Sequence, residues 1–412
     1  MFNLNDKIKN KNILIYGFGK SGKASFEYLK ILNSVVIFDD YKRVKHYFIS
    51  KKKIEKVKFD YIVLSPGIDI NKCKLKTYLK KNKNKIVTDL DIFYLNNKEN
   101  LKITITGTNG KSTTAKLLFE ILKDQKKDVK IAGNIGIPIL SIKKKSQKTI
   151  FVIEASSYQI EYSQYFKTDY AFILNISPDH LERHKSIQKY VHAKFKLLLN
   201  QNKNYHAFIE NNKYLDREIL KYKVKSKIVK INENIIIKKK INNYYFNNIN
   251  NFKNLLFLLK FAKVFKLNES KLFKTVNNFK GLEFRQQIIY KNKSITIIND
   301  SKSTSFSSTI NLLKSYDNIY WILGGLAKKG DKFLLPPKYY KGIKCYIFGK
   351  NITFFKKILK NKIRFFSSEK LEIILKKIAN EIKLNKNKHS YILFSPSAAS
   401  FDRFKNFEDR GH

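Results

Sequence analysis

The sequence has few cysteines, few acidic residues and no long apolar segment, and each shortage excludes a class of protein. Only two cysteines occur, Cys73 and Cys345, far apart and without metal-ligand spacing. This excludes a disulfide scaffold and a cysteine-based metal site, and it favours a reducing compartment. No run of about 18 apolar residues exists, and the first residues lack an apolar signal region. We therefore expect a cytoplasmic protein without membrane insertion.

Acidic residues are scarce relative to basic ones. The chain has 33 Asp and Glu against 83 Lys and Arg, which gives a formal net charge of +50. Such a charge ordinarily indicates a nucleic acid or a membrane surface as partner. Here the lysines are spread along the whole chain among Asn, Ile, Phe and Tyr, as in 80–85 and 242–254. This pattern favours biased composition over a dedicated surface, so we expect no specific nucleic acid partner but a preference for anionic ligands.

The sequence does contain a repeated alternation of β-branched runs and helical patterns. Runs that are apolar on both faces are typical of parallel strands covered by helices, and they predict an α/β fold. The hydrophobic content of 43% is sufficient for packed cores. The expected strands lie within residues 12–17, 34–40, 60–67, 102–107, 149–156, 169–177, 294–300, 318–325, 343–349 and 390–400.

Changes in composition predict three α/β domains. A polar segment at 94–100 separates the first strands from the next group, and a new alternation begins after residue 282. The predicted domains are residues 1–94, 95–282 and 283–412. Within the second, the Asn-rich region 200–254 is expected to form loops and peripheral strands, with helical patterns at 252–265 and 268–279.

The segment GTNGKSTT resembles a phosphate-binding loop that is two residues shorter than the usual G-x-x-x-x-G-K-[ST] pattern. It follows a predicted strand and opens a helical pattern, so backbone N–H groups at a helix N-terminus would face a phosphate. Gly107 and Gly110 permit a close approach, and Lys111 adds positive charge. Ser112 or Thr113 can reach Mg²⁺. Nucleotide binding is therefore predicted over an ordinary turn.

The first domain carries a second glycine-rich turn, GFGKSG at residues 17–22, with Asp39 and Asp40 at the end of the next strand. This pattern matches a dinucleotide fingerprint. A nucleotide-sugar diphosphate would fit the turn as well as NAD would, because either presents a pyrophosphate to the helix N-terminus. The third strand ends in LSPGI, which suits a ligand-facing loop or a plain tight turn.

Three further side chains after the phosphate loop are candidates for chemistry. Glu154 ends a predicted strand, where a carboxylate near a phosphate loop is placed to bind Mg²⁺. His180 lies in NISPDHLERH and Lys194 in the helical pattern YVHAKFKLLL. On composition alone, Lys194 would be one more solvated lysine on a helix face.

The segments GTNGKSTT, NIGIP, EASSYQIE and ISPDHLERHKSIQKYVHAK together resemble the Mur ligase family, ATP-dependent enzymes that form amide bonds in peptidoglycan precursors. The C-terminal segments NDSKSTS, GGLAKKGD and SPSAASFDRFKNFEDRG resemble the branch that adds D-glutamate. The resemblance covers nearly the whole chain. It implies a Rossmann-like domain for a UDP-sugar, a central ATPase domain and a Rossmann-like domain for the amino acid. It also implies that the short loop is this family's own phosphate cradle.

The resemblance assigns roles to individual residues of this sequence. The ATP-binding set is Gly107, Thr108, Asn109, Gly110, Lys111, Ser112, Thr113, Asn134, Asn251, Arg285 and Asp300. The UDP-sugar set is Gly19, Ser21, Asp39, Asp40 and Ser65, and the D-glutamate set is Lys302, Thr304, Lys328, Ser400 and Phe407. The catalytic set is Lys111, His180 and Lys194, and two Mg²⁺ ions would be held by Ser112, Glu154, His180 and an N-carboxylated Lys194.

The implied reaction joins D-glutamate to UDP-N-acetylmuramoyl-L-alanine through an acyl phosphate, in the cytoplasm and as a monomer. Three positions depart from the family pattern: Asn250 stands where histidine is usual, and Ser303 and Ser305 replace the more common Ala and Asn. The chain also ends at His412, shortly after the R-G pair, where relatives continue.

Other functions fit parts of the sequence less well. Another Mur-type ligase or a folylpolyglutamate synthase would share the central motifs. No D-N-P-R stretch supports a diaminopimelate ligase, and the N-terminal Rossmann-like region speaks against the folate enzyme. A basic nucleic-acid-binding NTPase is a remote alternative. A non-catalytic scaffold is disfavoured because every phosphate and metal candidate is present.

Overall fold

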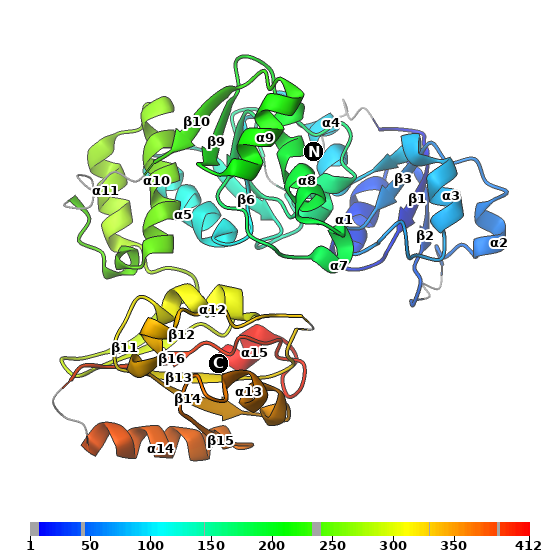
Figure 1. Ribbon diagram of the computed structural model, residues 1–412. Helices are drawn as coiled ribbons and strands as arrows, with labels where there is room; N and C mark the ends of the chain where they lie inside the picture. Colours follow the sequence, from blue (N-terminus) through cyan, green and yellow to red (C-terminus); the bar gives the residue numbers. More distant parts are fainter. Residues whose placement is uncertain (1–7, 43–45, 144, 233–239, 329, 385–387) are drawn as a thin grey trace. The chain divides into compact units, whose positions relative to one another are not determined.

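The computed structural model describes residues 8–42, 46–143, 145–232, 240–328, 330–384 and 388–412, and it has the predicted α/β fold with mostly parallel sheets (Figure 1). The chain divides into two compact units. The first comprises residues 1–241 with 253–277, and the second comprises 242–252 with 278–412. The first unit contains two sheets, and the division into three domains stays a prediction.

The first sheet is fully parallel and has the strand order β2-β1-β3-β4. Its strands are β1 (Asn12–Tyr16), β2 (Ser34–Phe38), β3 (Tyr61–Leu64) and β4 (Ile86–Val87). The helices of this region are α1 (Lys20–Leu29), α2 (Lys51–Ile54), α3 (Lys76–Lys81) and α4 (Asp89–Asn96). The apolar strands are buried on both faces, as parallel strands covered by helices require.

The second sheet is also parallel, with the order β10-β9-β8-β5-β7-β6. Its strands are β5 (Lys102–Thr106), β6 (Val129–Gly133), β7 (Ile150–Glu154), β8 (Tyr170–Ile173), β9 (His206–Glu210) and β10 (Lys227–Ile231). The helices are α5 (Lys111–Asp124), α6 (Ser157–Glu161), α7 (Leu181–His184), α8 (Ile187–Leu199), α9 (Lys213–Tyr222), α10 (Ile249–Val264) and α11 (Glu269–Asn278). One buried apolar cluster includes residues of both sheets, with Phe93 of α4 against Phe151 of β7.

The second unit contains a sheet of order β11-β12-β16-β13-β14-β15, in which only the β11–β12 pair is antiparallel. Its strands are β11 (Gln287–Lys291), β12 (Ile295–Asn299), β13 (Ile319–Gly324), β14 (Ile343–Phe348), β15 (Phe365–Ser368) and β16 (Ser390–Phe394). Its helices are α12 (Phe306–Leu313), α13 (Ile352–Leu359), α14 (Leu371–Leu384) and α15 (Phe407–Gly411). Trp321 of β13 is completely buried in its core.

All ten predicted strands are present, but the interpretation of region 200–254 was partly wrong. The segment contains helix α9, and β9 is an inner, buried strand of the second sheet. The many lysines and asparagines of region 200–254 made the apolar strand β9, which has only five residues, difficult to recognise in the sequence. The short or edge strands β4, β6, β11 and β15 were not predicted. Among the described residues no helix is both long and apolar enough to cross a membrane.

Candidate active site

The phosphate loop connects β5 to α5 and depends on two glycines in conformations that other residues avoid. Gly107 has φ +148° and Gly110 has φ +83°. Gly110 caps the N-terminus of α5, and a Cβ there would collide with the side-chain amide of Asn254 from α10. The backbone therefore needs glycine at both positions for conformation, and at Gly110 also for space.

Lys111 is folded back over this loop. Its Nζ donates to the carbonyl oxygens of Gly107 (2.9 Å) and Thr108 (2.7 Å). The next two residues, Ser112 and Thr113, lie buried in the first turn of α5. A positive charge and a helix N-terminus thus converge at one place, which is the arrangement that favours a phosphate.

A second loop, following β8, fixes the phosphate loop from the side. The backbone N–H of Asn109 donates to Asn175 Oδ1 (2.8 Å), and Asn175 Nδ2 donates to the carbonyl of Asn109 (2.9 Å). Thr108 Oγ1 accepts from the N–H of Ser177 (3.1 Å) and lies 3.0 Å from the hydroxyl of Tyr190. These bonds hold the loop in one shape before any ligand binds.

Lys194 is buried, so the expectation of a solvated lysine from composition was wrong. Only 2% of its surface is exposed. Its Nζ donates to the carbonyl of Gly107 (2.9 Å) and lies 4.6 Å from the ring centre of Tyr190. Burial, reinforced by the positive charge of Lys111, lowers the pKa of Lys194 well below its usual value. Burial thus shifts this amine toward its neutral form.

Glu154 is the buried carboxylate of this site. Its Oε1 accepts a hydrogen bond from Asn134 Nδ2 (2.7 Å), and the backbone N–H of Asn134 donates to its carbonyl (2.8 Å). Its Oε2 is buried and has no hydrogen-bond partner among the described residues. Since a buried carboxylate oxygen is costly without a partner, this atom is suited to a cation.

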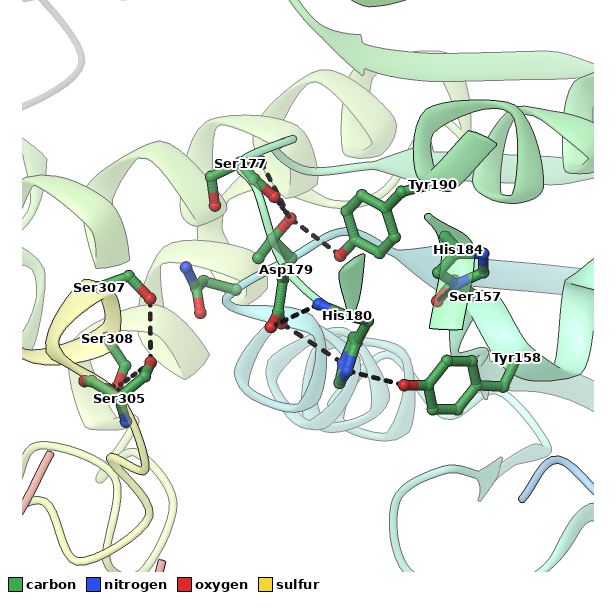
Figure 2. A network of polar contacts seen from close by, with 12 residues as sticks. Ser157, Tyr158, Ser177, Asp179, His180, His184, Tyr190, Ser305, Ser307 and Ser308 are labelled. Carbon is green, nitrogen blue, oxygen red and sulfur yellow. Dashed lines mark hydrogen bonds and ion pairs between the residues drawn. The ribbon is translucent and has the colours of Figure 1, made fainter. Parts of the chain in front are cut away.

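His180 stands at the start of α7 with a left-handed backbone, φ +53°. Its Nδ1 is 2.9 Å from the hydroxyl of Tyr158, and its Nε2 is 3.4 Å from Asp179 Oδ2. Figure 2 shows the imidazole between these two side chains. No three His, Cys, Asp or Glu side chains within the described part of the chain gather as a metal-binding group. A cation here would thus also need oxygens from Ser112, a modified lysine or the nucleotide.

In the first sheet, the predicted UDP-sugar residues gather at the carboxyl ends of the strands. Asp39 Oδ2 accepts from the N–H of Phe18 (2.7 Å), and Ser65 Oγ donates to the carbonyl of Gly17 (2.7 Å). Burial opposes ionisation of Asp39, but backbone N–H donors outweigh it and lower its pKa. Asp40 Oδ1 accepts from the hydroxyl of Tyr16 (2.7 Å). Gly19 caps α1, whose first turn carries Ser21.

The second unit places its predicted residues around β12 and α15. Burial raises the pKa of Asp300 to about 7, although Ser395 Oγ (2.8 Å) and the N–H of Gln286 (3.1 Å) donate to its carboxylate. Lys302 Nζ lies 3.7 Å from the ring centre of Phe407.

The remaining predicted residues differ in exposure. Thr304 and Lys328 are exposed, Ser400 is buried, and Arg285 is half-buried. Asn251 donates from Nδ2 to the carbonyl of Tyr245 (3.1 Å).

Sequence reasoning missed several residues that shape these sites. Tyr190, Asn175 and Asn254 support the phosphate loop. Tyr190 stands one helical turn before Lys194, and this i, i+4 spacing was the available signal. Arg410, within the R-G pair, is buried and donates to the carbonyls of Ser301 (2.6 Å) and Ala398 (2.9 Å).

Comparisons with known proteins agree with this geometry. A family model described as the Mur ligase middle domain matches residues 105–277. The UDP-N-acetylmuramoylalanine--D-glutamate ligase of Rickettsia felis is 32% identical, over 99% of this chain and 96% of the relative. The protein of the same name from Francisella tularensis subsp. novicida is also 32% identical, over 100% of this chain and 96% of its own.

Solved structures show the same fold. The MurF ligase from Thermotoga maritima in complex with ADP has a TM-score of 0.56 and 16% identity, and the match covers 96% of this chain and 93% of that one. The UDP-N-acetylmuramate-alanine ligase from the same organism has a TM-score of 0.55 and 16% identity, covering 94% and 96%.

Proposed function

The chain belongs to the Mur ligase family of ATP-dependent, amide-forming enzymes, and from this premise we propose that it adds D-glutamate to UDP-N-acetylmuramoyl-L-alanine during peptidoglycan precursor synthesis. One observation carries the choice of substrates: a D-glutamate ligase is 32% identical along 99% of the chain. The proposed enzyme acts as a monomer in the cytoplasm, with the UDP-sugar, ATP and amino-acid sites on domains 1–94, 95–282 and 283–412.

The reaction has to convert an inert carboxylate into an acylating agent. Transfer of the γ-phosphoryl group of ATP to the alanyl carboxylate forms a P–O bond, breaks the γ-phosphoryl bond to ADP and gives an acyl phosphate. The amine of D-glutamate then attacks the acyl carbon, phosphate leaves, and the amine proton passes to solvent. Phosphoryl transfer of this kind depends mainly on positioning and charge neutralisation.

The phosphate loop supplies the charge neutralisation in this proposal. Lys111 would turn from the carbonyls of Gly107 and Thr108 toward the phosphates, while the N-terminus of α5 holds them. His180, fixed between Tyr158 and Asp179, would stand at the edge of the reacting groups. The remaining proposed ATP contacts are Thr108, Asn109, Thr113, Asn134, Asn251, Arg285 and Asp300.

The residues present fit Mg²⁺. The unpartnered Glu154 Oε2 is the natural first ligand, and Ser112 and His180 would add two more. Bound Mg²⁺ would neutralise negative charge on the phosphoryl oxygens.

Lys194 is proposed to be N-carboxylated. Only a neutral amine can add CO₂, and burial favours that form here. The carbamate would turn a buried amine into an anionic oxygen ligand. Enzyme stripped of CO₂ should regain activity with bicarbonate, and ¹³C-bicarbonate should give a carbamate signal that a Lys194→Arg variant lacks. Wild-type enzyme that gives no signal and no response to bicarbonate would contradict the modification.

The substrates are tested by an amino-acid panel. Purified protein receives ATP, Mg²⁺ and UDP-N-acetylmuramoyl-L-alanine with D-glutamate, L-glutamate, L-alanine, meso-diaminopimelate or no amino acid, and phosphate release and the peptide product are measured. We expect product with D-glutamate alone, bound through Lys302, Thr304, Lys328, Ser400 and Phe407. Turnover with a different amino acid would reassign the chain within its family.

A further inference from the structure

A continuous series of side-chain hydroxyl groups runs through the second unit from Asp300 to the start of α12. The successive oxygen distances are Asp300 Oδ2 to Ser395 Oγ 2.8 Å, Ser395 Oγ to Thr309 Oγ1 2.8 Å, Thr309 Oγ1 to Ser303 Oγ 2.5 Å, Ser303 Oγ to Ser308 Oγ 2.8 Å and Ser308 Oγ to Ser305 Oγ 3.3 Å. We name Ser395, Thr309, Ser303, Ser308 and Ser305 the hydroxyl relay. We infer that the hydroxyl relay transmits the protonation state of Asp300 to the turn that carries Thr304.

The relay leads from the core to the surface. Ser395 and Thr309 are completely buried, and Ser303 is 3% exposed. Ser308 and Ser305 are half-buried, and Ser305 Oγ lies 2.9 Å from the hydroxyl of the exposed Ser307. Figure 2 shows Ser305, Ser307 and Ser308 at this outer end. Since its inner members are shielded from water, their protons are shared mainly with one another.

Each hydroxyl group carries one proton and can donate only once, so the donors must be ordered along the chain. An ionised Asp300 can only accept. Ser395 then donates to it, Thr309 donates to Ser395, and Ser303 donates to Thr309. Thr309 Oγ1 also lies 2.7 Å from Ser397 Oγ, a side branch that in this order donates to Thr309 as well. The oxygen of Ser303 is left to accept a proton from Ser308.

Ser308 has a competing acceptor. Its Oγ also donates to the backbone carbonyl of Ser305 at 2.7 Å, within the capping turn of α12. When Asp300 is neutral, its own proton can go to Ser395 and the whole order can reverse, so that Ser303 donates to Ser308 and Ser308 to the carbonyl of Ser305. Ionisation of Asp300 therefore draws the proton of Ser308 away from the turn next to Thr304.

The surroundings of Asp300 allow both states. Among the described residues, the charged groups Arg285 and Arg410 act on its carboxylate, and both favour ionisation. Its other partners are the hydroxyl of Ser395 and the backbone N–H of Gln286. Burial opposes ionisation and raises the pKa of Asp300 to about 7, so neither protonation state is excluded near neutral pH.

The consequence for catalysis rests on the proposed function. There, Asp300 contacts ATP and Thr304 belongs to the amino-acid subsite. A nucleotide hydroxyl that donates to Asp300 would favour the ionised form of its carboxylate. The hydroxyl relay would then adopt the order in which Ser395 donates to Asp300. The second unit would then contain an internal link between its two ligand contacts, made of hydrogen bonds alone.

Nuclear magnetic resonance of the full chain without ligands tests the relay independently of catalysis. ¹³C-labelled aspartate reports the ionisation of Asp300, and ¹⁵N-labelled serine reports the amide of Ser305. In the wild type we expect the chemical shift of the Ser305 amide to change with pH. Its midpoint should equal the midpoint of the change in the chemical shift of the Asp300 carboxyl carbon. Thr309→Val keeps the shape but removes the connecting hydroxyl, so Asp300 should still titrate while the response of Ser305 is lost.

Two further variants make the result decisive. Ser303→Ala removes the next link with a smaller change and should also abolish the response of Ser305, which covers the case that Thr309→Val does not fold. Ser307→Ala changes a residue beyond the end of the relay, so this variant should retain the response of Ser305. The inference is overturned if Ser305 follows Asp300 in both link variants, or if Ser305 in the wild type does not move when Asp300 titrates. A negative amino-acid panel would refute the ligase function and leave this experiment unaffected.

Discussion

At the scale of single residues, the candidate active site depends on where each buried charge finds its partners. Lys111 and Lys194 both donate to the carbonyl of Gly107, which brings two amines to one oxygen. Burial of Lys194, reinforced by the positive charge of Lys111, lowers the pKa of the Lys194 amine well below its usual value.

Lys111→Ala should abolish ATP-dependent turnover. Loss of a charged donor to the transferring phosphoryl group typically lowers kcat by about 100-fold or more. The measurement is phosphate release with all substrates present. Lys116→Ala is the matched control, since Lys116 lies on the same helix but pairs with Glu120 at the surface. Near-normal turnover of the Lys111 variant would refute its role.

His184 should make the protein less stable in mild acid. The side chain is buried, and its Nε2 lies 3.0 Å from Ser157 Oγ. Burial, aided by the charge of Arg183, lowers the pKa of His184 from 6.5 to about 4. The unfolded chain therefore binds this proton more readily, so stability is unaffected above about pH 6.5 and falls as the pH drops toward 4, by on the order of 3 kcal/mol at most.

Urea unfolding from pH 7 to pH 4 measures this effect against a His184→Gln variant, which cannot titrate. The variant should lose less stability on acidification. Asp89 and Asp300, whose pKa values burial raises to about 6 and about 7, contribute slopes of the opposite sign. Both proteins share these contributions, so the difference isolates His184. Parallel slopes would show that His184 binds its proton at the same pH in the folded and the unfolded chain.

At the scale of elements, the carboxylate of Asp91 connects helix α4 to the segment that follows α6. The buried Asp91 accepts from Ser163 Oγ (2.6 Å) and from the N–H groups of Gln164 (3.0 Å), Tyr165 (2.8 Å) and Phe166 (2.9 Å). These bonds orient the segment that follows α6. Helix α6 carries Tyr158, whose hydroxyl lies beside His180. Helix α4 therefore also helps to position a neighbour of His180.

Asp91→Asn should therefore destabilise the first unit. An amide turns two N–H donors toward groups that are themselves donors, and unsatisfied buried groups cost about 1–3 kcal/mol each. We expect a loss of roughly 3 kcal/mol or more in urea unfolding. Glu55→Gln removes the same charge at an exposed position and should change stability little. Equal stability of both variants would mean that the four donors find other partners.

At the scale of the whole molecule, the net charge of +50 is the most unusual property. An excess of this size binds polyanions through counterion release, whatever the function of the protein. Membership of the Mur ligase family and the phosphate loop indicate that ATP is used for amide formation and not for a reaction that depends on nucleic acid. Binding of RNA and stimulation by RNA are thus separate questions.

RNA should bind this protein without changing its turnover. At about 50 mM salt, a single-stranded RNA oligonucleotide should associate, and its affinity should fall steeply with added salt, as expected for contacts between lysines and phosphates. Fluorescence anisotropy measures the binding, and phosphate release measures the turnover. ATP hydrolysis that RNA stimulates and D-glutamate does not would favour a nucleic-acid-dependent NTPase.

The sequence by itself determined the α/β alternation, the shortened phosphate loop and the family, because strand periodicity and motif spacing are properties of neighbouring residues. Only the tertiary structure decided that Lys194 is buried and that five hydroxyl groups connect Asp300 to α12. It also decided that one oxygen of Glu154 has no hydrogen-bond partner among the described residues. Lys194 and Gly107 are 87 positions apart, and Ser395 and Asp300 are 95 apart. Burial and hydrogen-bond partners at such separations follow from how the sheets and helices pack, and no local pattern in the chain specifies them.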